Sequence, residues 1–217
     1  MKLIVLYNNY SAITLDIDSE ALGVYTLPDT ALLKDGKPFF IPDFANPCTL
    51  QGHLVVRICR LGRSISERFA HRYYDAITVG ATFTAENLRK ELSLQHRPWD
   101  LAVGFDGAAV IGKMIPLYTS KQQTQMEEEV GVNINFQPLK GDIQFFVLKG
   151  DTKIVEGVSG MMLNHIDNVI AQISKHYTLR QGDLIFTGCP TQPQVVNIND
   201  KITGWLGSEK VLQFNVK

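Results

Sequence analysis

Cysteine is scarce in this sequence, and its three thiols, Cys48, Cys59 and Cys189, form no recognisable pattern. Disulfide frameworks use an even number of cysteines, and zinc sites leave C-x-x-C or similar spacing. Neither feature occurs here. We therefore expect reduced thiols in a cytoplasmic protein.

Long hydrophobic runs and an excess of one charge are missing as well. The opening residues, MKLIVLYNNY, hold only a short apolar run before Asn8 and Asn9, too short for a secretory leader. No later run approaches the roughly 20 apolar residues of a transmembrane helix. Because 21 basic and 22 acidic residues give a net charge of -1, we expect neither nucleic acid nor a membrane as a partner.

The composition is that of a folded globular chain. Its 217 residues are 45% hydrophobic and 20% charged, which is enough to bury a substantial core. Short apolar runs are separated by glycine and proline, without strict alternation of strands and helices. We predict one domain over residues 1–217, of the α+β class and mainly β.

Local patterns predict several of these elements. The spacing of apolar residues from Met162 to Ile173 predicts a helix with one apolar face. Asp35-Gly36 predicts a hairpin turn within residues 24–41. Strands are expected at residues 3–6, 143–148, 154–158 and 212–216, with the middle two joined as a hairpin across Lys149-Gly150-Asp151.

The stretch from Phe69 to Pro116 is predicted to hold two helices and a strand–turn–strand unit. Apolar residues from Phe69 to Tyr74 recur at helical spacing, after a possible capping box at Ser64 and Glu67. The remaining expected elements are a strand at 77–79 ending at Gly80, a helix capped by Thr84 and ended by Pro98, and two strands around a GFDG turn within 101–111.

Four segments carry a resemblance to a known family. They read ATFTAENLR, WDLAVGFD, VIGKMIP and GDLIFTGCP, in this order along the chain. The order resembles the fumarylacetoacetate hydrolase family, whose motifs read N-D-x-T-A-R-D-x-Q, W-x-x-(A/S)-K-x-F-D, v-(I/L)-G-x-x-(I/V)-P and G-D-(L/I)-I-x-T-G-T-P. The resemblance runs across nearly the whole chain. It implies a mixed β-sandwich roll or pseudo-barrel with a few outer helices, usually assembled as a homodimer, with a small oxo acid as a possible ligand.

The amino-terminal segment resembles the family's N-Y strand end and the lid that follows it. Asn9 and Tyr10 match, but residues 11–15 lack the histidine that several members use for acid–base chemistry. The resemblance therefore implies that residues 1–23 form an amino-terminal strand and a remnant lid segment.

The positions of the family's metal ligands are substituted. An E-x-E strand and the aspartate of the first motif hold a divalent metal in the family, and these places fall at Gln51, His53 and Thr82. Two carboxylates two residues apart on a strand project to one side, where both reach a hard cation at about 2.1 Å. An amide, an imidazole and a hydroxyl offset none of its charge. We expect no metal cofactor; the alternative is Mg²⁺ or Mn²⁺.

Charged positions around the pocket are changed too. The family's lysines fall at Leu27 and Val103, and the arginine and aspartate of A-R-D fall at Glu86 and Asn87. Cys189 replaces a threonine without a base at any motif-linked position, which favours a small structural residue over a nucleophile. The resemblance implies a remnant pocket formed by Asn9, Tyr10, Gln51, His53, Thr82, Phe105, Asp106, Thr187, Gly188 and Cys189.

Three functions stay open at this point, and the catalytic residues stay unknown. The first is a degenerate member, or pseudoenzyme, that binds a small molecule or serves as an oligomer partner without metal-dependent catalysis. The second is an active Mg²⁺-dependent hydrolase, isomerase or decarboxylase for a 2-oxo or 2,4-dioxo acid. The third is metal-free chemistry built on His53, His71 or Cys189.

Overall fold

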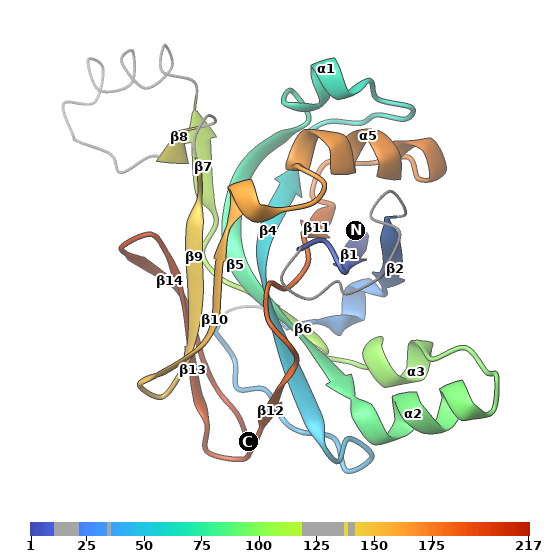
Figure 1. Cartoon of the computed structure of the whole chain (residues 1–217), viewed down its shortest axis with the longest axis vertical. Helices are drawn as coiled ribbons and strands as arrows, with labels where there is room; N and C mark the ends of the chain where they lie inside the picture. Colours follow the sequence, from blue (N-terminus) through green and yellow to red (C-terminus); the bar gives the residue numbers. More distant parts are fainter. Residues whose placement is uncertain (11–21, 34–35, 119–136, 139–141) are drawn as a thin grey trace.

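Two β-sheets that pack face to face form the body of the molecule, with a few helices outside them (Figure 1). The computed structural model describes residues 1–10, 22–33, 36–118, 137–138 and 142–217. The predicted remnant lid after Tyr10 falls mainly on residues 11–21, outside the described residues. The mainly β architecture with outer helices confirms the predicted fold class.

The larger sheet has ten strands in the order β2-β1-β11-β4-β5-β6-β3, with β12 paired to β4, β7 to β5 and β8 to β7. Pairing is parallel between β1 and β11, β3 and β6, and β7 and β8, and antiparallel elsewhere. Its strands are β1 (Leu3–Tyr7), β2 (Gly23–Leu27), β3 (Leu32–Leu33), β4 (Cys48–Ile58), β5 (Tyr74–Ala85), β6 (Ala109–Ile111), β7 (Ile115–Tyr118), β8 (Gln137–Pro138), β11 (Leu184–Phe186) and β12 (Gln194–Val196).

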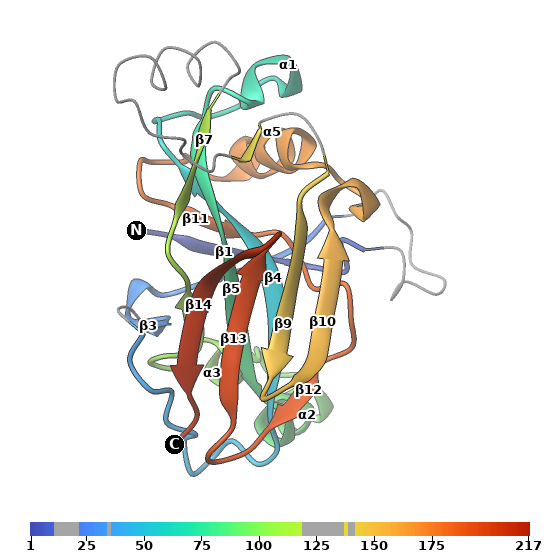
Figure 2. The same cartoon turned by 90° about the vertical axis from the view of Figure 1, so that its left-hand side faces the viewer.

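The smaller sheet is antiparallel in the order β10-β9-β13-β14 and faces the viewer in Figure 2. The predicted hairpin between β9 and β10 is confirmed, with Gly150 at φ +57° in its turn. The carboxy-terminal strand is confirmed as well. The four strands are β9 (Gln144–Lys149), β10 (Thr152–Val158), β13 (Lys201–Leu206) and β14 (Glu209–Asn215).

The long β4–β5 pair is the centre of the fold. One side of it packs on the smaller sheet through a buried core that includes Leu54, Val79, Val147 and Ile202. The predicted strand end at Gly80 is wrong, because β5 continues through it. A Cβ there would lie 2.8 Å from the Val110 carbonyl oxygen, so glycine lets the neighbouring backbone approach without ending the strand.

Four α-helices and two 3-10 helices are present in the described residues. The predicted apolar helix near the carboxy-terminal third is confirmed, but it begins at Ile166 and not at Met162. The helices are α1 (Glu67–Ala70), α2 (Glu86–Leu94), α3 (Asp100–Val103), α5 (Ile166–His176), η1 (Asp29–Ala31) and η2 (Ser159–Met161). None of them combines the length and apolar character needed to cross a bilayer.

The predicted helix around Phe69–Tyr74 is wrong beyond its first turn. Only α1 forms, and Tyr74 opens β5, where it pairs with Ile58. Ser64 has φ +51° and makes no cap, since the N-cap residue is Ser66. Tyr73 and Tyr74 pack against a buried cluster of mainly aliphatic side chains. Tertiary packing therefore overrides the helical spacing.

Two further local predictions are corrected, and a third falls partly outside the described residues. Thr84 stays in β5 and does not cap α2; the first helical amide, on Glu86, donates to the Pro47 carbonyl at 3.1 Å. The residues before the GFDG turn form helix α3 and not a strand. The predicted turn at Asp35-Gly36 includes Asp35, which lies outside the described residues; of the described residues on its two sides, those of β3 pair in parallel with β6, and Phe39 bridges Val216.

Candidate functional site

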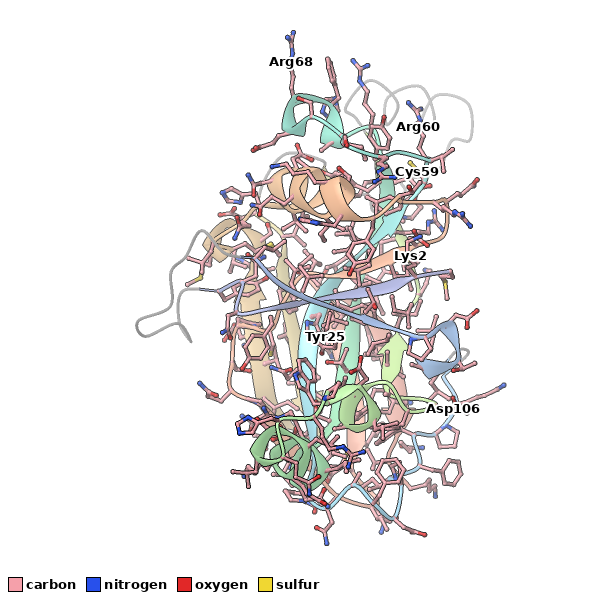
Figure 3. The ribbon with its side chains drawn as sticks, turned by 90° about the vertical axis from the view of Figure 1, so that its right-hand side faces the viewer. Lys2, Tyr25, Cys59, Arg60, Arg68 and Asp106 are labelled. Atoms are coloured by element: carbon pink, nitrogen blue, oxygen red, sulfur yellow. The ribbon has the colours of Figure 1, made fainter. Side chains whose placement is uncertain are left out.

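A cavity of about 400 Å³ opens on the side of the β4–β5 pair that faces away from the smaller sheet. Strands β1 and β2 border it on one side and helices α2 and α3 on the other; Figure 3 shows Tyr25 over the middle of the sheet. The lining residues that matter below are Tyr7, Tyr25, Gln51, Glu86, Arg89 and Trp99. A cavity of about 460 Å³ near Met1 and Lys113 contains none of the predicted site residues.

The register of β4 and β5 brings three predicted positions together on the side that faces this cavity. Of the three, only Gln51 lines the cavity, while His53 and Thr82 are buried. Gln51 pairs directly with Thr82, and His53 follows two residues later on the same side of β4. Between them Gly52 faces the smaller sheet, where an added Cβ would lie 2.8 Å from Val147 Cγ2. Nε2 of His53 lies 2.9 Å from Oγ1 of Thr82. The three side chains are therefore neighbours, as their spacing predicts.

His53 is 1% exposed, and burial lowers the pKa of its imidazole to about 3, with a smaller opposing effect from the Gly188 backbone. Its ring packs edge-on against Phe186, with centroids 5.6 Å apart. Desolvation penalises the charged form of a buried imidazole. His53 is consequently a neutral hydrogen-bonding group at physiological pH.

Tyr25 lines the cavity and was not predicted from the motifs. Burial raises the pKa of its phenol above the ordinary value, against a smaller lowering effect of the Thr82 side chain. Its ring meets Trp99 edge-on at a centroid distance of 5.2 Å. The sequence contained one signal for Tyr25. It lies two residues before Leu27, so both side chains project to the same side of β2.

The ion pair between Glu86 and Arg89 was also missed. Nε and Nη2 of Arg89 lie 3.1 and 2.8 Å from Oε2 of Glu86, while the Thr49 hydroxyl donates to Oε1 at 3.2 Å. Both carboxylate oxygens are therefore occupied, and the two charges cancel in the cavity wall. The three-residue spacing at the start of a helix was the signal for this pair.

The two positions that the resemblance aligns with family lysines, Leu27 and Val103, lie in the core. Leu27 and Val103 are both buried in one apolar cluster with Leu3, Val55 and Phe186. A cation at either place would need a partner that these neighbours do not provide. The cavity therefore lacks the positive charge that the family motif would place there.

The side chains of Asn9 and Thr187 have a structural role, because both are hydrogen-bonded to the backbone of neighbouring segments. The Asn9 amide donates to the carbonyls of Thr187 at 2.9 Å and Asn164 at 3.1 Å, and its Oδ1 accepts from the Asn164 amide at 2.9 Å. The Thr187 hydroxyl donates to the Leu54 carbonyl at 2.9 Å. Gly188 follows at φ +102°, with Asn9 Cβ 3.0 Å from where its own Cβ would stand. These residues tie the end of β1 to the GDLIFTGCP turn.

Tyr10 and Cys189 are buried beside that turn. The Tyr10 hydroxyl has no partner with good hydrogen-bond geometry in the described part of the chain, and its ring lies 6.5 Å from that of Phe145. Burial raises the pKa of the Tyr10 phenol and of the Cys189 thiol. A thiol that stays protonated is a poor nucleophile, which argues against covalent chemistry at Cys189.

Phe105, Asp106 and His71 lie away from the cavity. Phe105 packs against Phe39 and Phe44, with centroids 6.5 and 5.5 Å apart. Asp106 is exposed at the edge of the molecule, distant from Tyr25 (Figure 3). His71 is exposed and ends α1. The structure does not bring these three residues to the predicted pocket.

A divalent metal does not fit the residues at the family's ligand positions. Gln51, His53 and Thr82 offer no carboxylate, and the Nε2 atom of His53 is already bonded to Thr82. Glu86, the acid in the cavity lining, has both oxygens occupied. Across the described ranges, no group of three or more His, Cys, Asp or Glu side chains could hold a metal ion. Mg²⁺ and Mn²⁺ prefer carboxylate oxygen, so this donor set is unsuitable.

The protein is mainly β, with a cavity of about 400 Å³ beside its central strand pair. The fumarylacetoacetate hydrolase C-terminal family model matches residues 8–213, and the chain belongs to this family. The mitochondrial oxaloacetate tautomerase of Mus musculus is 23% identical over 219 residues, covering 100% of this chain and 91% of that protein.

Solved structures of the same fold agree with this assignment. Fumarylpyruvate hydrolase from Pseudomonas aeruginosa, in complex with Mn²⁺ and pyruvate, has a TM-score of 0.82 at 19% identity, covering 100% of this chain and 89% of that one. A 5-carboxymethyl-2-hydroxymuconate delta-isomerase from Mycobacterium smegmatis has a TM-score of 0.80 at 20% identity, covering 99% and 78%. At sequence identities of 19% and 20%, these comparisons show that the fold is similar.

Proposed function

We propose that this chain is a small-molecule-binding member of the family whose pocket works without a divalent metal. The observation that carries this proposal is the 2.9 Å hydrogen bond between His53 and Thr82. By the family resemblance these positions correspond to a glutamate and an aspartate of the family motif, and here Nε2 of His53 and the Thr82 hydroxyl bond to each other. A cavity of about 400 Å³ lies on the same side of these strands and is lined by Gln51, which supports a ligand there.

The alternative is a working metal-dependent enzyme. The names of relatives support it, because they include an oxaloacetate tautomerase and a fumarylpyruvate hydrolase in complex with Mn²⁺ and pyruvate. Such an enzyme would act on a 2-oxo or 2,4-dioxo acid and would require Mg²⁺ or Mn²⁺ bound through oxygen ligands. The neutral side chains of Gln51, His53 and Thr82 argue against it.

Turnover assays separate these functions. We expect no conversion of oxaloacetate or an acylpyruvate by the wild-type chain in the presence of Mg²⁺ or Mn²⁺. Turnover abolished by EDTA would favour the enzyme. Turnover that survives EDTA but is lost in His53→Ala or Cys189→Ser would favour metal-free chemistry at those residues.

Assembly and location remain predictions. The family resemblance implies a homodimer, which light scattering after size-exclusion chromatography would test. The reduced thiols favour the cytoplasm, whereas the Mus musculus relative is named mitochondrial. Imaging of the tagged full chain in its own cells would test the location.

A further inference from the structure

A second surface, away from the cavity, concentrates basic side chains at one end of the molecule. Residues 59–73 and 174–180 form it, and Figure 3 shows Arg60 and Arg68 at that end, with Tyr25 nearer the middle. We propose that this basic surface binds an acidic peptide segment of a partner protein, in which acidic and apolar side chains are interspersed. The proposal does not depend on the function proposed for the cavity.

Hydrogen bonds hold the two segments side by side. The amide of Gly62 donates to the carbonyl of Leu179 at 3.0 Å, and the amide of Leu179 donates back at 2.8 Å. The amide of Ser64 donates to the carbonyl of Ser174 at 2.8 Å, and the amide of Ile65 donates to the hydroxyl of Ser174 at 2.8 Å. Because these bonds fix the backbone between the cations, a ligand does not have to order it.

The positive charge of this surface is not balanced by acidic neighbours. Its six Lys and Arg side chains are all exposed, and none of them has an ion-pair partner in the part of the chain that the structure describes. Glu67, the one acid of the two segments, accepts from the Asn168 side-chain amide at 3.0 Å. An anion can therefore bind these cations without breaking an existing pair. The six are Arg60, Arg63, Arg68, Arg72, Lys175 and Arg180.

Aromatic rings hold three of the guanidinium groups on the surface. Cζ of Arg68 and Cζ of Arg72 lie 5.5 and 5.1 Å from the ring centroid of Phe69. Cζ of Arg60 lies 6.0 Å from the ring centroid of Tyr73. Such contacts restrict a guanidinium without using its N–H donors. Each group therefore keeps its donors for a carboxylate, which arginine binds through paired N–H bonds.

Exposed apolar side chains lie among the arginines. Leu61 follows Arg60 in the sequence and is 67% exposed. Phe69 follows Arg68 and is 42% exposed. Apolar area beside charged groups is area that a partner can bury while its own charges pair with the cations. The surface therefore favours a segment with acidic and apolar residues over a purely charged one.

The charge of the remaining chain disfavours larger anionic partners. The surface holds six of the 21 basic and one of the 22 acidic residues, so the rest of the chain has 15 basic and 21 acidic residues and a net charge of -6. A long polyanion or an anionic membrane would also meet this negative remainder, which repels it. A second copy in a two-fold contact would bring the same cations against each other. A short acidic segment contacts the basic surface alone.

Fluorescence anisotropy with labelled peptides tests this inference. The probe is a short fluorescein-labelled peptide of Glu-Glu-Leu repeats, and its matched control carries Gln at every Glu position. We expect the wild-type chain to bind the acidic peptide saturably, with a Kd about fivefold or more below that of the neutral peptide at low salt. Because salt screens exposed charges, about 0.5 M NaCl should remove most of this difference.

Paired substitutions assign the binding to this surface. Arg68→Gln together with Arg72→Gln should weaken binding of the acidic peptide about fivefold or more. Lys90→Gln together with Arg97→Gln is the matched control, because it removes two exposed cations on and just after α2, at the opposite end of the molecule from α1 (Figure 1). The control should change binding less than about twofold.

A second pair, Arg60→Gln together with Arg63→Gln, should weaken binding of the acidic peptide to a similar extent, even if the first pair fails to fold. Leu61→Ser should weaken it about twofold, because it removes exposed apolar area between these arginines.

Equal binding of the acidic and neutral peptides, or unchanged binding in both arginine pairs, would overturn the inference. Tighter binding of an oligo(dT) strand or of phosphatidylserine vesicles than of the acidic peptide would overturn it in favour of another class of partner. A dimer in light scattering that the Arg68→Gln and Arg72→Gln pair converts to a monomer would overturn it in favour of a second copy. Unchanged binding in Leu61→Ser would contradict the apolar part of the partner.

Discussion

Nε2 of His53 and Oγ1 of Thr82 lie 2.9 Å apart on β4 and β5, the two longest strands in the described residues. Both side chains are almost fully buried, at 1% and 2% exposure. A buried polar group needs its partner far more than an exposed one does. The pair therefore links β4 to β5 through their side chains and should contribute measurably to stability.

Thr82→Val tests that contribution, because valine keeps the shape of threonine and removes the hydroxyl. We expect a loss of about 1–3 kcal/mol in the free energy of unfolding, since Nε2 of His53 is left buried without its partner. Urea denaturation followed by circular dichroism measures it. Thr152→Val, at an exposed position of β10, should change stability by no more than about 0.5 kcal/mol. Equal effects of the two substitutions would contradict the role of the pair.

The free energy of unfolding at acidic pH should depend on His53. Its folded-state pKa of about 3 lies below the ordinary value of 6.5, so the unfolded chain binds a proton that the folded chain excludes. The contribution of neutral His53 to the free energy of unfolding is fully present above about pH 6.5. It is lost as the pH falls toward 3, by up to about 1.4 kcal/mol per pH unit.

Unfolding measured at several values between pH 7 and pH 4 checks this dependence. His53→Gln should flatten the slope, because the variant has no imidazole at that place. His176→Gln, which replaces an exposed histidine at the end of α5, should leave the slope as it is. A wild-type slope that His53→Gln does not change would refute the assignment to this residue.

Restoring the family's carboxylates should create a metal site. The triple variant Gln51→Glu, His53→Glu and Thr82→Asp places three acids on neighbouring positions of β4 and β5. Their mutual repulsion should lower Tm without metal, and Mg²⁺ should raise it again by binding only the folded state. Catalysis should recover only in part, because Leu27 and Val103 still leave substrate charge unsupported.

Thermal unfolding with and without MgCl₂ measures this effect. A control with Gln144→Glu, Thr203→Asp and Gln213→Glu adds the same charge to the smaller sheet and should show no Mg²⁺-dependent shift. The prediction fails if both triple variants respond to Mg²⁺ alike, or if neither responds.

Charge in the cavity wall can be changed with one substitution. Glu86→Gln removes the carboxylate that holds Arg89, so the guanidinium becomes available to an anionic ligand. We expect benzoate, a small carboxylate probe, to bind severalfold more tightly to this variant than to the wild-type chain. Glu91→Gln, on the exposed face of the same helix, is the control. Benzoate binding that is insensitive to Glu86→Gln would show that the pair does not face the ligand.

The sequence predicted the cluster of Gln51, His53 and Thr82 on β4 and β5 better than it predicted the residues that line the cavity. Gln51, His53 and Thr82 belong to motifs on two paired strands, where a spacing of two and a direct cross-strand partner determine which side chains meet. Tyr25 and Arg89 come from other elements whose positions depend on the whole fold. Phe105 and Asp106 lie inside a well-matched motif, yet α3 turns them away from the cavity.

Local patterns failed where tertiary packing decided the conformation. The helical spacing from Phe69 to Tyr74 is real, but β5 offers Tyr74 a strand partner and a buried neighbour. Gly80 was predicted to end the strand. The glycine is explained by the close approach of the Val110 backbone, which the sequence alone does not reveal. Hairpins with Gly in the turn and alternating flanks, such as β9–β10, were predicted correctly because their signals are local.

The most direct test of a metal-independent pocket is a calorimetric titration of MnCl₂ into the wild-type chain after EDTA treatment and dialysis. With a neutral donor set at Gln51, His53 and Thr82, we predict no saturable heat above dilution into the millimolar range. The triple carboxylate variant, titrated in parallel, should bind Mn²⁺ and so show that the method detects a site at this place. Saturable binding of Mn²⁺ to the wild-type chain with a micromolar Kd would contradict the account.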